Sequence, residues 1–234
     1  MSRDQEDRGS FRRARRPEQK QQRELAILEA ARGLALREGT RNVTLGDIAG
    51  EIGMHKTALL RYFESREEIY LRIATEACQD WAQALDQELK ALSENDLNGV
   101  AEAFARTVNA RPLLCDLFAH LSLNLERNVS PQSLLAGKLS GVAAFEEIVG
   151  AVRVVLPDLT EAEVRGLLGA VTTLAASAWQ VTNPPPAAEQ VFRENPALAR
   201  SVSAFLPPIA RFTETYILGL RARRQEPDPG SIDR

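Results

Sequence analysis

The chain has 234 residues, of which 44% are hydrophobic and 26% are charged, a globular profile with room for one large domain or two smaller ones. Its net charge of −3 does not by itself indicate a nucleic-acid partner. Cys78 and Cys115 lack metal-ligand spacing, which excludes the usual zinc sites and a disulfide framework, so we expect reduced thiols, no metal and no cofactor.

The sequence contains no segment that we expect to enter a membrane. Its N-terminus is polar and lacks a secretory signal. The longest uncharged run, residues 166–188, contains Gln180, Asn183 and three prolines, and its apolar part is better explained as a buried helix. We therefore expect a cytoplasmic protein.

Positive charge is concentrated near the N-terminus. Residues 8–23 hold seven basic side chains and one acidic side chain, Glu18, so this stretch has a charge of +6. We expect residues 1–16 to be a disordered basic arm, because they are charged and show no periodicity. Such an arm is typical of nucleic-acid binding, and a solvated tail explains the same charges equally well.

Helical patterns fill the segment after the arm. The predicted helices span about residues 17–39, 44–53, 55–62 and 66–92. Capping boxes mark two of their starts, from Thr44 to Asp47 and from Ser65 to Glu68. Gly39 and Gly53 are expected to end the first two helices.

The rest of the chain shows no strand pattern either. Further helices are predicted over about 96–109, 112–126, 131–156, 160–182 and 207–223. A capping box from Thr160 to Glu163 supports one of these starts. Residues 184–186 should form a stiff extended connection, Asn195 and Pro196 should cap a short additional piece, and residues 225–234 should form a flexible tail. The fold class is therefore all-α.

Residues 44–63 fit a helix-turn-helix. A small residue, Ala49, allows the two helices to approach closely, and Gly53 supplies a permissive turn. Leu59 and Phe63, four residues apart, should form the buried side of the second helix. Its other side would then be free to enter a major groove. A small helical hairpin with a solvated polar face is the alternative interpretation.

At these residues the chain closely resembles the TetR family of transcriptional regulators. Residues 27–31, Ile-Leu-Glu-Ala-Ala, are similar to the family's first helix. Residues 44–53, from Thr44 to Gly53, are similar to the second helix, and residues 59–66 resemble the end of the recognition helix and the start of the fourth helix. The resemblance covers about residues 20–72.

The resemblance implies a three-helix DNA-binding domain, residues 17–66, and a larger helical domain for effector binding and dimerisation, residues 67–224. The residues expected to contact double-stranded DNA are Thr44, His55, Lys56, Thr57, Leu60, Arg61, Tyr62 and Arg66. Leu60 departs from the family, because a phosphate-binding Tyr is common there. His55 replaces a better N-cap, and either contacts DNA or is solvated.

The resemblance also implies a homodimer, whose two recognition helices would read a palindromic operator. Broad apolar faces in the 160–182 helix and the last helix could form a four-helix bundle across a two-fold axis, or could fill the protomer's own core. The expected interface residues are Leu168, Val171, Ala175, Phe212, Tyr216 and Leu220.

A small-molecule effector is a further implied partner, and its identity cannot be read from the sequence. Apolar residues interspersed with polar groups are typical of a pocket. The expected pocket residues are Phe104, Cys115, Phe118, His120, Leu121, Asn124, Phe145 and Trp179. His120 can equally be a satisfied or exposed residue, and Trp179 can belong to the core or to an interface.

Two other functional classes remain to be compared. An enzyme is not expected, because the chain has no nucleophile elbow, phosphate loop or zinc-type spacing. A helical protein-interaction scaffold would explain the C-terminal helices but not the basic arm with the glycine-turn hairpin. We therefore predict a DNA-binding regulator, with release from the operator by an effector as the family's usual outcome and activation left open.

Overall fold

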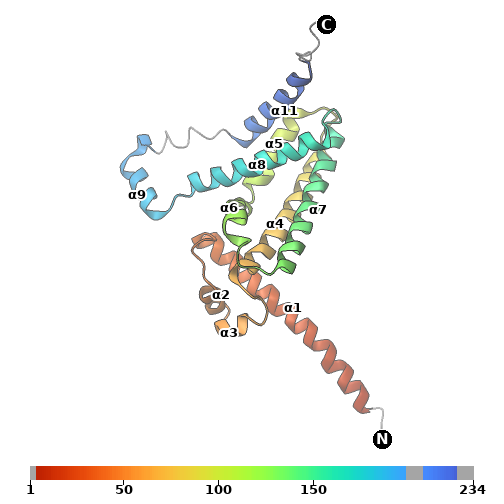
Figure 1. The fold of residues 1–234 in the computed structure, drawn as a ribbon, viewed down its shortest axis with the longest axis vertical. Coiled ribbons are helices and arrows are strands. Elements are labelled where there is room, and N and C mark those ends of the chain that lie inside the picture. The colour runs from red at the N-terminus through yellow and green to blue at the C-terminus, as the bar shows by residue number, and fades with distance from the viewer. Residues whose placement is uncertain (1–3, 199–207, 226–234) are drawn as a thin grey trace. The chain divides into compact units, whose positions relative to one another are not determined.

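The computed structural model describes residues 4–198 and 208–225, and the side chains of residues 4–17, 122, 123 and 225 are not described. Within these ranges the chain forms helices and no strands, which confirms the predicted all-α fold class (Figure 1). The chain divides into two compact units. Unit 1 comprises Met1–Ile73 and His120–Leu135, and unit 2 comprises Ala74–Ala119 and Ala136–Arg234.

Unit 1 contains the N-terminal helices and a returning segment from later in the chain. Its elements are α1 (Asp4–Glu38), α2 (Leu45–Glu51), α3 (Lys56–Leu59), the start of α4 (Arg66–Leu89), a π-helical turn η1 (Leu121–Leu125) and the start of α7 (Pro131–Val155). The returning segment, His120–Leu135, was expected in the effector domain. The boundary near residue 66 that we expected lies at 73/74 in the structure.

The core of unit 1 follows the helical periodicity of the sequence. Ile27 and Ala31 from α1, Ile48 from α2 and Leu59 from α3 are fully buried. The fourth helix adds Tyr70, whose hydroxyl donates a hydrogen bond to the carbonyl oxygen of Ala31 at 3.3 Å. Burial of these apolar side chains supplies the main stabilising contribution and fixes the hairpin on α1.

The first helix begins earlier than predicted. We expected residues 1–16 to be disordered, whereas α1 is helical from Asp4 and passes through Pro17. Five of residues 4–16 are arginines, which are strong helix formers. The structure thus has helix over residues 4–16, where we expected a disordered arm, and residues 1–3 lie outside the described ranges.

Unit 2 is built around one buried tryptophan. It contains the rest of α4 and α7 together with α5 (Leu97–Asn109), α6 (Pro112–His120), α8 (Glu161–Thr182), α9 (Pro186–Glu194) and α11 (Ile209–Gln225). The Trp81 ring is fully buried and makes edge contacts with Phe104, Phe118 and Phe145, at centroid distances of 6.3, 6.0 and 6.3 Å. Its indole N–H donates to the Thr107 hydroxyl at 3.0 Å, so the polar atom is satisfied.

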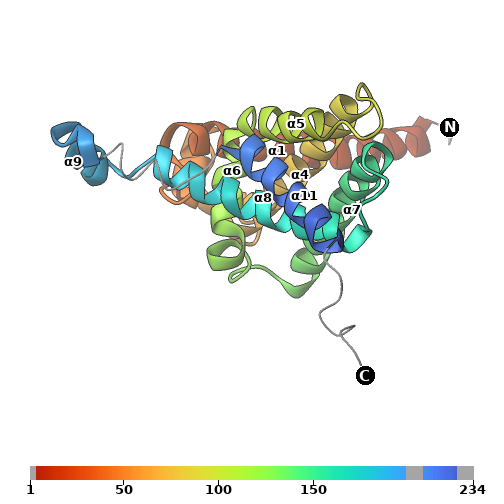
Figure 2. The same cartoon turned by 90° about the horizontal axis from the view of Figure 1, so that it is seen from above.

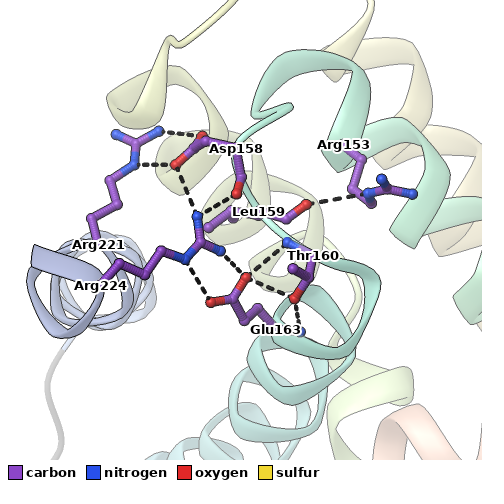
Figure 3. Close-up of polar contacts among 7 residues, drawn as sticks. All are labelled: Arg153, Asp158, Leu159, Thr160, Glu163, Arg221 and Arg224. Atoms are coloured by element: carbon purple, nitrogen blue, oxygen red, sulfur yellow. Dashed lines mark hydrogen bonds and ion pairs between the residues drawn. The ribbon is translucent and has the colours of Figure 1, made fainter. Parts of the chain in front are cut away.

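The last helix, α11, packs against both α5 and α8 (Figures 1 and 2). Figure 3 shows how its C-terminal turns are fixed. The Arg221 guanidinium donates two 2.8 Å hydrogen bonds to the Asp158 carboxylate, a bidentate geometry. Arg224 pairs with Glu163, which also caps α8 by accepting from the backbone N–H of Thr160 at 2.7 Å. This cluster, Asp158, Glu163, Arg221 and Arg224, ties α11 to the start of α8.

Most predicted helix starts are confirmed by their caps. Thr44 and Thr160 form complete capping boxes with Asp47 and Glu163. The Ser65 hydroxyl accepts from the backbone N–H of Glu68 at 3.0 Å, but the Glu68 carboxylate reaches the N–H of Glu64 instead of Ser65. The Asp96 carboxylate caps α5 by accepting from Gly99 N–H at 2.8 Å.

Two predicted boundaries in the second half of the chain differ from the structure. Pro186 opens α9 rather than extending a stiff connection, because proline is tolerated in a first helical turn. The helix predicted to reach residue 126 changes at His120 into η1. The last helix begins at Ile209, and Pro207 lies outside the described residues. Residues 226–234 and most of the piece after Asn195 also lie outside them.

Candidate nucleic-acid interface

The helix-turn-helix forms through a left-handed glycine. Gly53 has φ of +64°, a conformation that costs an L-residue with a Cβ about 1–2 kcal/mol. The turn is closed by Met54 N–H, which donates to the carbonyl oxygen of Ala49 at 2.8 Å. Ala49 is buried, so α2 and the turn can approach closely. The sequence prediction for this hairpin is confirmed.

The second helix of the hairpin, α3, has only 4 residues, but hydrogen-bonded turns continue beyond its end. After α3, Tyr62 N–H and Phe63 N–H both donate to the carbonyl oxygen of Leu59, at 2.9 and 3.3 Å. Leu59 and Phe63 are buried, as predicted, and anchor one side of this helix. The opposite side is therefore held in a fixed orientation.

Most of the residues predicted to contact DNA lie on the exposed part of this hairpin. Exposed are Thr44, His55, Lys56, Thr57, Leu60 and Arg61, and Tyr62 is half-buried. Lys56 and Arg61 provide positive charge, and 43% of Leu60 is exposed although it is apolar. A single exposed leucine is common on protein surfaces, and beside cationic side chains it suits contact with a thymine methyl.

Thr44 has a structural role as well as an exposed position. Its hydroxyl accepts from Asp47 N–H at 3.2 Å, and its own N–H donates to the Asp47 carboxylate at 2.8 Å. These hydrogen bonds from Thr44 lower the pKa of Asp47. The carboxylate therefore stays charged at the start of α2, where the helix dipole favours it.

His55 occupies the N-cap position of α3 without a side-chain cap hydrogen bond. Its side chain is exposed. The expected poor capping is thus confirmed, and its contact with DNA stays a prediction.

Arg66 has a different position from the one we predicted. Instead of pointing a free guanidinium at phosphate, it donates to the carbonyl oxygens of Val43, at 2.5 Å, and Thr40, and pairs with Glu67 at 2.9 Å. Its guanidinium carbon also lies 5.1 Å from the centre of the Tyr70 ring. The donors of Arg66 thus hold the loop between α1 and α2 on α4, and its contact with phosphate stays a prediction.

The predicted effector residues fall into two sets. In unit 2, Phe104 and Cys115 are buried and Phe118, Phe145 and Trp179 are half-buried around the core. Three of these rings surround Trp81, which sequence reasoning did not select. In unit 1, the imidazole Nδ1 of His120 lies 3.3 Å from the Asn124 amide nitrogen, and Leu121 is half-buried. The structure thus assigns the eight residues to two units.

One polar group in unit 2 was missed. Asp116 is buried, and its carboxylate accepts from the Gln180 amide at 3.3 Å. An acid inside the apolar run from Leu113 to Phe118 was the available signal in the sequence.

Burial raises the pKa of the Cys78 and Cys115 thiols to about 12 and about 11, so both are protonated at neutral pH.

The predicted dimer residues of α8 belong to the protomer's own core. Leu168, Val171 and Ala175 are buried within unit 2, so their assignment to a subunit interface is corrected. Phe212, Tyr216 and Leu220 of α11 are half-buried and pack against the same core. The exposed residues of these two helices instead include Gly166, Gly169, Thr173, Ser177, Thr215 and Leu218.

Sequence comparison with known families gives two adjacent matches. Residues 27–73 match the family described as bacterial regulatory proteins, tetR family, and residues 75–224 match the tetracyclin repressor-like C-terminal domain. Among curated proteins, none matches the chain significantly. No helix in the described part of the chain is long and apolar enough to cross a bilayer.

Solved structures share the fold. A FadR from Thermus thermophilus, a TetR family transcriptional repressor in complex with lauroyl-CoA, aligns with a TM-score of 0.55 at 14% identity, covering 90% of this chain and all of that one. A protein from Streptomyces coelicolor A3(2), described as a possible TetR family transcriptional regulator, aligns with a TM-score of 0.56 at 16% identity, covering 86% and 100%.

Proposed function

Because the chain belongs to the TetR family of transcriptional regulators, we propose that it is a repressor released from a palindromic operator by a small-molecule effector. The observation that carries the DNA-binding part is the exposed hairpin face with Lys56, Leu60 and Arg61, anchored from behind by Leu59 and Phe63. Its cationic side chains can meet phosphates or guanine, and Thr57 can meet phosphates or base edges. Because the proposed partner is chromosomal DNA, the proposed site of action is the cytoplasm.

We propose a homodimer in which exposed faces of α8 and α11 meet across a two-fold axis. Half of Leu218 is exposed, and Gly169 and Thr173 are small exposed residues of α8. Small residues permit close approach of helices in a four-helix bundle. Two recognition helices would then reach half-sites separated by whole helical turns of DNA, about 34 Å each.

Sedimentation tests the dimer. Leu218→Glu should convert the protein to monomers, because two carboxylates would be buried at the axis. Val154→Glu is the matched control, since Val154 is exposed on α7. Unchanged sedimentation of the Leu218 variant would contradict this interface.

We propose that the effector enters unit 2 at the half-buried side of the aromatic cluster around Trp81. Phe118, Phe145 and Trp179 supply apolar surface, and the Asp116–Gln180 pair supplies a buried polar group. Binding here favours a molecule that is mostly apolar with one hydrogen-bonding group. Tryptophan fluorescence in a ligand screen that includes lauroyl-CoA tests this site, and Phe118→Ala should abolish any quenching that a bound ligand produces.

Selection from random duplexes tests the function as a whole. The proposal predicts enrichment of an inverted repeat that competes with random DNA by a factor of at least about 10³. Failure to enrich any sequence would contradict sequence-specific binding and would favour the helical scaffold.

A further inference from the structure

One carboxylate in unit 1 holds two distant segments together. Glu68, in the first turn of α4, accepts a hydrogen bond from the backbone N–H of Glu64 at 2.6 Å through Oε2. Its Oε1 accepts from the hydroxyl of Ser133 at 2.9 Å. Glu64 directly follows the buried end of the recognition hairpin, whereas Ser133 lies in the first turn of α7. Both oxygens are thus used, one for each segment.

Both ends of this bridge are oriented by helix caps. The N–H of Glu68 donates to the Ser65 hydroxyl at 3.0 Å, which fixes the start of α4. The Ser133 hydroxyl accepts from the Ser130 hydroxyl at 3.0 Å, and Ser133 N–H donates to the same Ser130 oxygen at 3.2 Å. The Ser133 hydroxyl is therefore correctly placed only while the first turn of α7 is formed.

The segment that precedes Ser133 contains an unusual helical turn. After α6, the chain forms η1 and then reaches Ser130 through a short connection. Single π-helical turns are rare and often occur at functional sites. A rearrangement of this turn would move Ser130 and Ser133, which follow it in the chain.

We propose that Glu68 is a positioning residue that couples the start of α7 to the recognition helix. While Ser133 is in place, Glu68 is held in the rotamer that binds Glu64 N–H, and the end of the hairpin is fixed. When the segment from His120 to Leu135 rearranges, this restraint on the hairpin is lost. The inference rests on the proposed DNA-binding function and adds the contact by which the DNA-reading face is regulated.

The test is a double-mutant cycle on affinity for the selected duplex, with Ser133→Ala, Glu68→Gln and the double variant. We expect Ser133→Ala to weaken binding by roughly tenfold or more, the loss typical of a hydrogen bond to a charged group. In the Glu68→Gln background the same change should have no further effect, because the bridge is already broken. Additive effects, or no effect of Ser133→Ala, would overturn the proposal.

Ser140→Ala is the matched control. Ser140 is also an α7 serine that contacts α4, accepting from the Gln79 amide at 2.8 Å, but both residues lie in unit 2. This variant should lose a neutral hydrogen bond between α4 and α7 outside unit 1 and keep the wild-type affinity. If Ser133 had only a structural role, Ser133→Ala and Ser140→Ala would lose similar amounts of thermal stability and similar amounts of affinity for the duplex. That result would contradict coupling.

Hydrogen exchange separates failure of this inference from failure of the proposed function. Without any DNA, Ser133→Ala should accelerate amide exchange at Glu64 and the preceding hairpin residues by roughly threefold or more, whereas Ser140→Ala should not. If the wild-type protein bound no DNA, this result would still establish the bridge. Unchanged exchange at residues 55–64 in Ser133→Ala would refute it.

Discussion

At the residue scale, two arginines of the DNA-binding region have opposite roles. Arg61 is exposed on the hairpin face, whereas Arg66 donates to the carbonyl oxygens of Thr40 and Val43. The sequence places both within a family pattern for DNA contact. Only the folded chain shows that one guanidinium satisfies backbone carbonyls, because its acceptors lie more than 20 residues away.

These roles predict different salt dependences. Arg61→Ala should weaken DNA binding and reduce the slope of log affinity against log salt by about 1, if the side chain meets a phosphate. Arg66→Ala should instead lower the free energy of unfolding by about 2 kcal/mol, because charge-assisted hydrogen bonds are lost, and leave that slope unchanged. Chemical denaturation and a titration series in KCl measure both quantities. A reduced slope for Arg66→Ala would identify it as a phosphate ligand.

At the element scale, the hairpin was predictable and the packing of α8 was not. Capping boxes, the Gly53 turn and the apolar spacing of α2 are local signals, and the structure confirms them. Whether Leu168 and Val171 face a partner subunit or the protomer's own core depends on where α11 packs, which no local signal specifies. The start of α9 was missed because three consecutive prolines also fit an extended chain.

Replacement by alanine should change the stability of the protein in opposite directions at Gly53 and Gly50. Gly53→Ala should destabilise the protein by about 1–2 kcal/mol, because its positive φ strains a residue with a Cβ. A Cβ at either Gly53 or Gly50 meets no atom within 4 Å, so neither change creates a clash. Gly50→Ala, inside α2, should therefore stabilise by about 0.5–1 kcal/mol. Thermal unfolding of both variants tests this, and destabilisation of equal size would contradict it.

At the scale of the whole molecule, the sequence identified the fold and the family but not the contacts between distant segments. The bridge from Glu68 to Ser133 joins residues 65 positions apart, and its donor is a serine of the kind found at many helix starts. The cluster that fixes α11 likewise joins residues more than 60 positions apart. Such contacts depend on the tertiary fold, and so did the division of the predicted effector residues between the two units.

The α8–α11 cluster predicts a pH dependence of stability. Hydrogen bonds from Arg221 lower the pKa of Asp158 from its ordinary 3.8, and the Thr160 backbone N–H lowers that of Glu163 from 4.5. The unfolded chain therefore binds more protons, so this stabilisation is present above about pH 4.5 and is lost as the pH falls through the lowered values. Asp158→Asn should be less stable than wild type at pH 7 and should approach it at pH 3.

Thermal unfolding at several pH values measures this convergence. Glu189→Gln is the control, because Glu189 lies on α9 and is 4.0 Å from Arg193 with both side chains largely exposed. It should follow the wild-type pH profile. A constant difference between Asp158→Asn and wild type at every pH would mean that the carboxylate does not titrate with folding.

The central claim is that the exposed hairpin face reads DNA. The most direct measurement is the affinity of the intact protein for the selected duplex and for a scrambled duplex across a salt series, with wild type and a Lys56→Ala/Arg61→Ala variant. The account predicts specific binding that falls linearly on a log–log plot, with a slope smaller by about 2 in the variant. Equal affinity for both duplexes, or no binding at low salt, would contradict it.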